Sequence, residues 1–155
     1  LGLGLAISLG WDRDQVEDLG LALFFHDLGL AAEITSSQGY RPVCREGESA
    51  HHHHPDQSAN CLNSLPGANM GILEAVRGHH ENLDGSGYPR GLRADELSPA
   101  ARLVRIVDLY ELATSGCLKP DAMNPFAALQ MMRYEMRDQI DQELLGAFVL
   151  FLGQT

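Results

Sequence analysis

The stretch SPAARLVRIVDLYELA, residues 98–113, has the pattern of a helix that is buried along one side. Ser98 is a preferred N-cap residue, and Pro99 suits the first helical position because the amide hydrogen it lacks has no partner there. Behind this start, apolar residues recur at helical spacing and form one stripe: Leu103, Ile106, Val107 and Tyr110. We therefore expect a core helix here, with other helices packed around it.

Similar start signals and apolar spacings occur on both sides of this stretch. Asp12, with Gln15 three positions later, predicts a capping box ahead of a helix over residues 13–27, which Gly29 is expected to end near His26 and Asp27. Further helices are expected over residues 54–62, 70–79, 124–136 and 140–152. Residues 32–53 show little periodicity and are expected to form a long irregular connection. No segment shows sustained strand alternation, so the sequence predicts an all-α fold.

The composition limits the classes of partner and compartment. The chain has 155 residues, 45% of them hydrophobic, which is enough for one domain over residues 1–155 with a continuous core. A net charge of −10 argues against binding to nucleic acid polymers or anionic membranes, which reward clustered Lys and Arg. Cys44, Cys61 and Cys117 are widely spaced, so we expect reduced thiols in a cytoplasmic protein. No apolar run reaches the roughly 18 residues of a spanning helix, so no membrane insertion is expected.

The chain begins abruptly on an apolar run, LGLGLAISL at residues 1–9, with no polar residues before it and no basic flank typical of a signal peptide. This pattern is more typical of an element cut part-way than of a natural start. We therefore expect the sequence to be a fragment of a longer protein.

Histidines and aspartates are placed at or near the ends of several predicted helices. Taken singly, each histidine is typical of a helix cap or a polar surface, and His51 to His53 are typical of a solvated run. The set as a whole favours a metal site, because helix ends in a bundle can bring side chains to one point. Its members are His26, Asp27, His54, His79, His80 and Asp108. Imidazole and carboxylate groups are suitable ligands for iron, manganese, nickel and zinc.

Adjacent ligand pairs favour two metal ions over one. Successive residues on a helix lie about 100° apart, so neither His26 and Asp27 nor His79 and His80 can share a helix face. Each pair can serve two neighbouring ions, or one ion where the helix ends. Two ions close together activate water and neutralise charge on phosphate oxygens, which is the chemistry of phosphoester hydrolysis.

Four motifs in order resemble the HD-GYP subgroup of the HD-domain phosphohydrolases. They are HDLG at 26–29, HP at 54–55, HHENLDGSGYP at 79–89 and ARLVRIVDLYELATS at 101–115, and similarity continues through 140–149. The resemblance covers nearly the whole chain and is specific, because HDxG is joined to HHExxDGSGYP. It implies a helical bundle around a centre of two or three divalent metals, commonly iron or manganese. It also implies hydrolysis of cyclic di-GMP to linear pGpG or GMP in bacterial signalling.

The resemblance assigns roles to individual residues. His26, Asp27, His54, His79, His80 and Asp108 match the family's metal ligands, with His26 and Asp27 at the catalytic centre and Asp27 as the bridging carboxylate. Asp27, His54, His79 and His80 complete one ion's shell, while His26 and Asp108 begin the second. The family places further ligands on a helix that would lie before Leu1, so we expect the chain to lack that helix or an upstream regulatory domain. A third ion is therefore not expected.

Two departures from the family pattern leave an alternative open. The family usually follows HDxG with a Lys that contacts phosphate, where this chain has Leu30, and it usually has an Arg-Pro-Tyr segment where this chain has Cys117-Leu118. Lys119 and Arg90 are candidate substitutes for binding the substrate. The alternative to a phosphodiesterase is a degenerate signalling module that keeps the fold and binds a nucleotide or protein partner.

The segment after the histidine pair is expected to form a loop beside the metals. Gly85 and Gly87 can take positive φ, Pro89 fixes the exit, and Asp84 can hold the loop by bonds to the backbone. No catalytic role is expected for Tyr88. Glu81 is expected to orient a ligating histidine. In the family this loop is associated with docking of GGDEF domains, and an upstream receiver or sensor domain is usual, so both are possible partners besides cyclic di-GMP.

Overall fold

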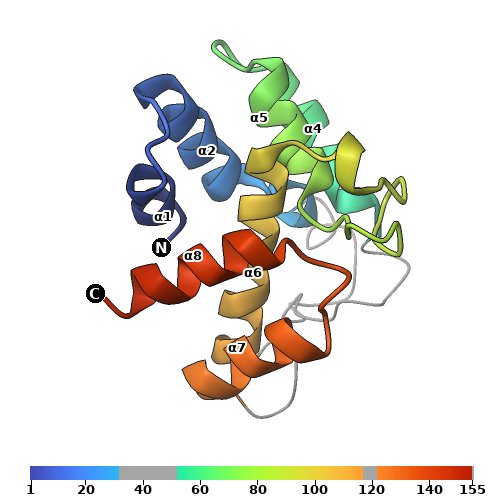
Figure 1. Cartoon of the computed structure of the whole chain (residues 1–155). Coiled ribbons are helices and arrows are strands. Elements are labelled where there is room, and N and C mark those ends of the chain that lie inside the picture. The colour runs from blue at the N-terminus through green and yellow to red at the C-terminus, as the bar shows by residue number, and fades with distance from the viewer. Residues whose placement is uncertain (32–51, 117–121, 155) are drawn as a thin grey trace.

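The computed structural model describes residues 1–31, 52–116 and 122–154 of the chain, and these residues fold into helices and loops. Figure 1 shows the arrangement in space. The helices are α1 (Gly2–Ser8), α2 (Arg13–Phe25), α4 (His54–Asn63), α5 (Met70–Gly78), α6 (Pro99–Ser115), α7 (Pro125–Tyr134) and α8 (Gln142–Leu152), with a short 3-10 helix, η2 (Ala94–Glu96). In the described ranges, strand-like pairing is limited to one isolated bridge between Asp84 and Arg93. The prediction of an all-α fold is confirmed.

Helix α6 is the core helix of the bundle, as the sequence predicts. Ser98 caps it by accepting a hydrogen bond from the backbone N–H of Ala101, and Gly116 ends it in the left-handed conformation with φ of 82°. It packs against α1, α2, α5, α7 and α8, and Figure 1 shows it crossing the middle of the molecule. All four residues of its apolar stripe are buried: Leu103, Ile106, Val107 and Tyr110. Elements distant in sequence are therefore held around one helix.

Helix starts follow the predicted capping residues. The capping box between Asp12 and Gln15 is present, Asn124 caps α7, and α4 has its proline in the first turn. The ends lie within a few residues of the predicted ones. Residues 1–9, expected as an interrupted element of unspecified type, contain α1.

The expected role of Gly29 as a helix terminator is wrong. Helix α2 ends at Phe25, before His26 and Asp27, and residues 28–31 are helical again. A Cβ atom on Gly29 would lie 2.5 Å from the backbone oxygen of His54. This glycine is therefore required by the close approach of the turn to α4, which brings Asp27 beside His54.

Some predictions concern parts of the chain that the structure does not describe. The expected irregular connection falls mostly in residues 32–51, and Cys117 and Lys119 fall in residues 117–121. Within the described residues, none of the helices combines the length and apolar character needed to cross a bilayer.

Candidate metal centre

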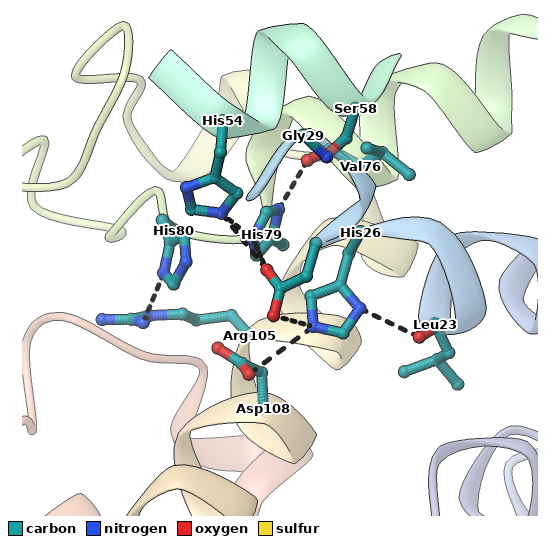
Figure 2. A network of polar contacts seen from close by, with 11 residues as sticks. Leu23, His26, Gly29, His54, Ser58, Val76, His79, His80, Arg105 and Asp108 are labelled. Atoms are coloured by element: carbon teal, nitrogen blue, oxygen red, sulfur yellow. Dashed lines mark hydrogen bonds and ion pairs between the residues drawn. The ribbon is translucent and has the colours of Figure 1, made fainter. Parts of the chain in front are cut away.

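Four separate segments bring the predicted ligands to one place. His26 is the C-cap of α2 and Asp27 follows it, while His54 is the first residue of α4. His79 is the C-cap of α5, with His80 next, and Asp108 lies within α6. The backbone N–H of Gly29 donates to the Ser58 hydroxyl at 2.8 Å, which fastens the turn after Asp27 to α4. Figure 2 shows the labelled histidines and Asp108 directed toward a common centre.

The two carboxylate oxygens of Asp27 face two different groups of side chains. Oδ1 lies 3.2 Å from Nε2 of His54 and 3.6 Å from Nε2 of His79. Oδ2 lies 3.5 Å from Nε2 of His26, and the same nitrogen is 3.7 Å from Oδ1 of Asp108. A carboxylate in this position can contribute one oxygen to each of two adjacent ions.

Backbone carbonyls fix the orientation of two imidazoles. Nδ1 of His26 lies 2.9 Å from the Leu23 carbonyl oxygen, and Nδ1 of His79 lies 2.6 Å from the Val76 carbonyl oxygen. Because a carbonyl can only accept, each Nδ1 carries the hydrogen and donates it. In the neutral rings, Nε2 then has the lone pair and is directed toward Asp27. Such outer hydrogen bonds are typical of metal-binding histidines.

Neighbouring groups and burial shift the pKa values of three predicted ligands. Burial would raise the pKa of Asp27, but the neighbouring imidazoles of His54, His79 and His26 hold it far below its ordinary value. Burial and repulsion from His80 lower the pKa of His79 to about 3. Burial would lower the pKa of His26, but a hydrogen bond to Asp108 and the charges of Asp27 and Asp108 raise it to about 9. At neutral pH Asp27 is therefore ionised, His79 is neutral, and His26 holds a proton that a bound metal must displace.

The donor set fits a divalent transition metal. One potential ligand atom from each of Asp27, His54, His79 and His80 lies within 4.8 Å of the others. Nε2 of His54 and Nε2 of His79 are 3.1 Å apart, a separation expected of two ligands to one ion. Oδ2 of Asp108 is buried without a hydrogen-bond partner among the described residues. Buried carboxylate oxygens without a partner are costly, and a cation would satisfy this one.

The loop over residues 84–89 lies against this centre. Asp84 accepts a hydrogen bond from the backbone N–H of Ser86 at 2.9 Å, as predicted, and Gly85 has a φ of 82°. The ring of Tyr88 stacks on His80, with 4.6 Å between ring centroids, and on His52 at 4.2 Å. Pro89 follows with a cis peptide bond. Tyr88 therefore covers one side of the histidine cluster.

Two predictions about this region are wrong. Gly87 does not have positive φ; a Cβ there would lie 2.5 Å from both the Glu81 Cα and the His80 backbone oxygen. Glu81 does not orient a ligating histidine, because its buried carboxylate accepts hydrogen bonds from the backbone N–H groups of Arg90 and Leu92, at 2.7 and 2.9 Å. Both residues instead hold the loop close to the histidine pair.

Arg105 is a residue of the site that the sequence reasoning did not identify. It lies on α6, is only 6% exposed, and places one guanidinium nitrogen 3.3 Å from Nδ1 of His80. The sequence feature that points to it is an Arg within an apolar helix, one turn before Asp108. Of the predicted substrate residues, Arg90 lies exposed on the loop after Pro89, and Lys119 lies outside the described residues.

Comparison with known proteins gives the same assignment as the motifs. A sequence model of the HD domain family matches residues 3–144. Cyclic di-GMP phosphodiesterase PA4108 of Pseudomonas aeruginosa is 29% identical over 99% of the chain and 37% of its own length. The 3'3'-cGAMP-specific phosphodiesterase 1 of Vibrio cholerae is 28% identical over 94% of the chain and 34% of its own length. The chain thus spans little more than a third of these relatives.

Solved structures show the same fold. A cyclic GMP-AMP specific phosphodiesterase of Vibrio cholerae superimposes with a TM-score of 0.75 at 12% identity, covering 98% of this chain and 42% of that one. An HDG"Y"P protein, Bd1817, from Bdellovibrio bacteriovorus also gives 0.75, at 18% identity, covering 97% of this chain and 49% of that one. Because the family match spans most of the chain and the predicted motifs meet in one centre, the chain belongs to the HD domain family, in its HD-GYP subgroup.

Proposed function

We propose that this chain is a metal-dependent phosphodiesterase that hydrolyses cyclic di-GMP to linear pGpG or GMP. The observation that carries the proposal is the position of Asp27, whose Oδ1 faces the imidazole nitrogens of His54 and His79 while its Oδ2 faces that of His26. A carboxylate shared between two positions that each have an imidazole is suited to a two-metal hydrolase acting on phosphate esters. Relatives named as phosphodiesterases of cyclic dinucleotides support the same reaction class.

The residues divide into two proposed metal positions. Asp27, His54, His79 and His80 would hold one divalent ion, and Asp27, His26 and Asp108 would contribute to a second. Iron or manganese suits this mixed set of imidazoles and carboxylates, and nickel or zinc is a further candidate. When bound, such ions supply an activated water and offset negative charge on the phosphate. His26 and Asp27 orient the centre, and the Tyr88 side of the loop limits access of bulk water to the buried histidines.

The candidate substrates are two cyclic dinucleotides, and the candidate protein partner is a GGDEF domain. Cyclic di-GMP is the proposed substrate, and 3'3'-cGAMP is the second candidate because a relative named for it matches at nearly the same identity. For a protein partner, we propose that residues 84–89 dock a GGDEF domain, since Asp84 and Ser86 are exposed there. The upstream receiver or sensor domain stays a prediction.

The deciding experiment compares metal-free protein with protein reconstituted with iron, manganese, nickel or zinc. Each sample is incubated with cyclic di-GMP or 3'3'-cGAMP, and linear products are separated by chromatography. Turnover of cyclic di-GMP with at least one metal is the expected result. Full metal loading without turnover of either nucleotide would overturn the proposal in favour of the degenerate binding module.

The variant Asp27→Asn tests the shared carboxylate. It keeps the shape of the side chain but removes the charge that both positions use. Loss of a group that only orients a metal ligand costs about 10–100-fold, so loss of a shared ligand should cost more than about 100-fold in kcat/KM. Metal analysis of the purified variant should also show fewer bound ions.

Asp14→Asn is the matched control, because Asp14 is an exposed carboxylate in the first turn of α2, away from the centre. It should retain wild-type metal content and turnover. Equal activity of the Asp27→Asn variant and this control would contradict the assignment.

A further inference from the structure

We propose that Arg105 is the phosphate-binding cation of the metal centre, a role that rests on the proposed function. Arg105 lies three residues before Asp108 on α6, so both side chains leave the same face of the helix. One guanidinium nitrogen, NH1, is 3.3 Å from Nδ1 of His80, and the other, NH2, is 3.2 Å from Oδ1 of Asn82. Figure 2 shows the guanidinium extended beside His80, with Asp108 coming from the same helix. The cation is therefore part of the wall of the centre.

Arg105 carries a permanent charge at a buried position of α6. Arg105 is 6% exposed and is flanked along α6 by the buried residues Val104 and Ile106. Removing a guanidinium from water is costly, whereas a neutral amide could donate hydrogen bonds to Asn82 and His80. Arg stays charged at every working pH and its planar fork matches two oxygens of a phosphate. A permanent cation in contact with His80, a predicted metal ligand, is therefore suited to bind an anionic substrate.

Arg105 would oppose the binding of a metal ion to His80, unlike the carbonyl groups that orient His26 and His79. A guanidinium can only donate, so Nδ1 of His80 must accept its hydrogen bond and use the ring's lone pair. His26 and His79 are arranged the opposite way, with Nδ1 donating to a carbonyl. A divalent ion held by the Asp27, His54, His79 and His80 group would compete with Arg105 for His80, and the two cations would repel each other. A phosphate between them relieves the repulsion, because it is attracted to both.

Two other arginines in the described part of the chain lie close to carboxylates outside the centre. Arg77 lies 3.7 Å from Asp56, and Arg102 lies 3.1 Å from Asp141. Among the described residues, Arg105 is the guanidinium for which a contact with a member of the ligand set is found. In a chain of net charge −10, a local cation is needed to attract a dianionic dinucleotide.

The test measures two affinities in Arg105→Gln and in Arg133→Gln, a charge-matched control on α7 whose side chain contacts Gln142. Manganese affinity is measured by electron paramagnetic resonance, and affinity of the manganese-loaded protein for inorganic phosphate is measured by calorimetry. For Arg105→Gln we expect phosphate binding to weaken at least tenfold and manganese binding to tighten severalfold. For Arg133→Gln we expect no change in either.

Opposite changes in the two affinities are the signature of this role. If both affinities fall together, or if phosphate binding is unchanged, Arg105 only supports the structure and the inference is overturned. Arg105→Lys keeps the charge but loses the fork, so it should recover part of the phosphate binding. Circular dichroism verifies that each variant is folded.

The outcome is separable from that of the proposed function, because neither affinity depends on turnover. A wild-type protein that binds phosphate through Arg105 without hydrolysing any nucleotide would disprove the enzyme and keep the inference. Where turnover exists, Arg105→Gln should raise KM for cyclic di-GMP at least tenfold.

Discussion

Asp27, His26 and His79 illustrate how neighbouring residues acquire opposite proton affinities from their surroundings. His26 faces two carboxylates, which stabilise its charged form. His79 is fully buried and close to other imidazoles, which destabilise its charged form. Without metal, the pair therefore behaves as one protonated and one neutral histidine around a single carboxylate.

These opposite shifts predict an optimum in the stability of the metal-free protein. The pKa of His26 is raised to about 9, so its contribution is complete below the ordinary value near 6.5 and is lost as pH rises toward 9. The pKa of His79 is lowered to about 3, so its contribution is present above about 6.5 and is lost as pH falls. Each limb should change the free energy of unfolding by at most about 1.4 kcal/mol per pH unit.

Urea unfolding in the presence of chelator, from pH 5 to pH 9, measures both limbs. His26→Gln should flatten the alkaline limb and leave the acidic limb in place. A free energy of unfolding that rises steadily between pH 7 and pH 9 would contradict this assignment.

The sequence predicts roles that follow from the type of a residue and its place in the order of motifs. It does not predict roles that depend on which parts of the backbone lie close together in the fold. The six predicted ligands meet because each lies at a recognisable helix end or on the core helix. The roles of Glu81, Gly29 and Gly87 depend on close contact with backbone atoms of other turns and loops, which local sequence patterns do not contain. Arg105 was missed because an Arg within an apolar helix is usually explained by a stem lying along the surface.

At the level of elements, the loop after α5 is packed too closely to accept a side chain at Gly87. In Gly87→Ala, the new Cβ would meet the backbone of residues 80–82. Overpacking of this kind costs about 1–3 kcal/mol, and the displaced backbone belongs to His80. We expect lower stability, measured by chemical denaturation, together with weaker metal binding.

Gly146→Ala in α8 is the matched control, because nothing lies within 4 Å of its added Cβ. Alanine favours a helix over glycine by about 1 kcal/mol, so this variant should be more stable than wild type and bind metal unchanged. Equal effects of the two substitutions would show that the loop tolerates a side chain.

For the whole molecule, the centre joins segments that are otherwise connected through the apolar core. The predicted ligands come from the turn after α2, the start of α4, the end of α5 and the middle of α6. A metal that binds only the folded state adds about 2.7 kcal/mol at a free concentration 100 times its Kd. For a chain of 155 residues this should raise Tm by roughly 5–10 °C.

Thermal melting with manganese and with chelator measures this shift. Asp27→Asn should lose most of it, whereas Asp14→Asn should keep it. A shift of the same size in both variants would mean that the stabilising ion binds elsewhere.

The exposure of Asp27 affects how readily a bound metal ion would exchange with the surrounding solution. Its side chain is 48% exposed, while those of His54 and His79 are 3% and 0% exposed. Asp27 is therefore the solvent-accessible member of this group, and we expect ions to exchange on its side of the centre while the protein stays folded. The affinities of divalent transition metals for a given site follow one general order, so the metal that is bound in a cell depends strongly on which metals are available. We therefore expect the bound ion to be one supplied by the medium that last surrounded the protein. Growth medium and purification buffer would then decide which ion is recovered.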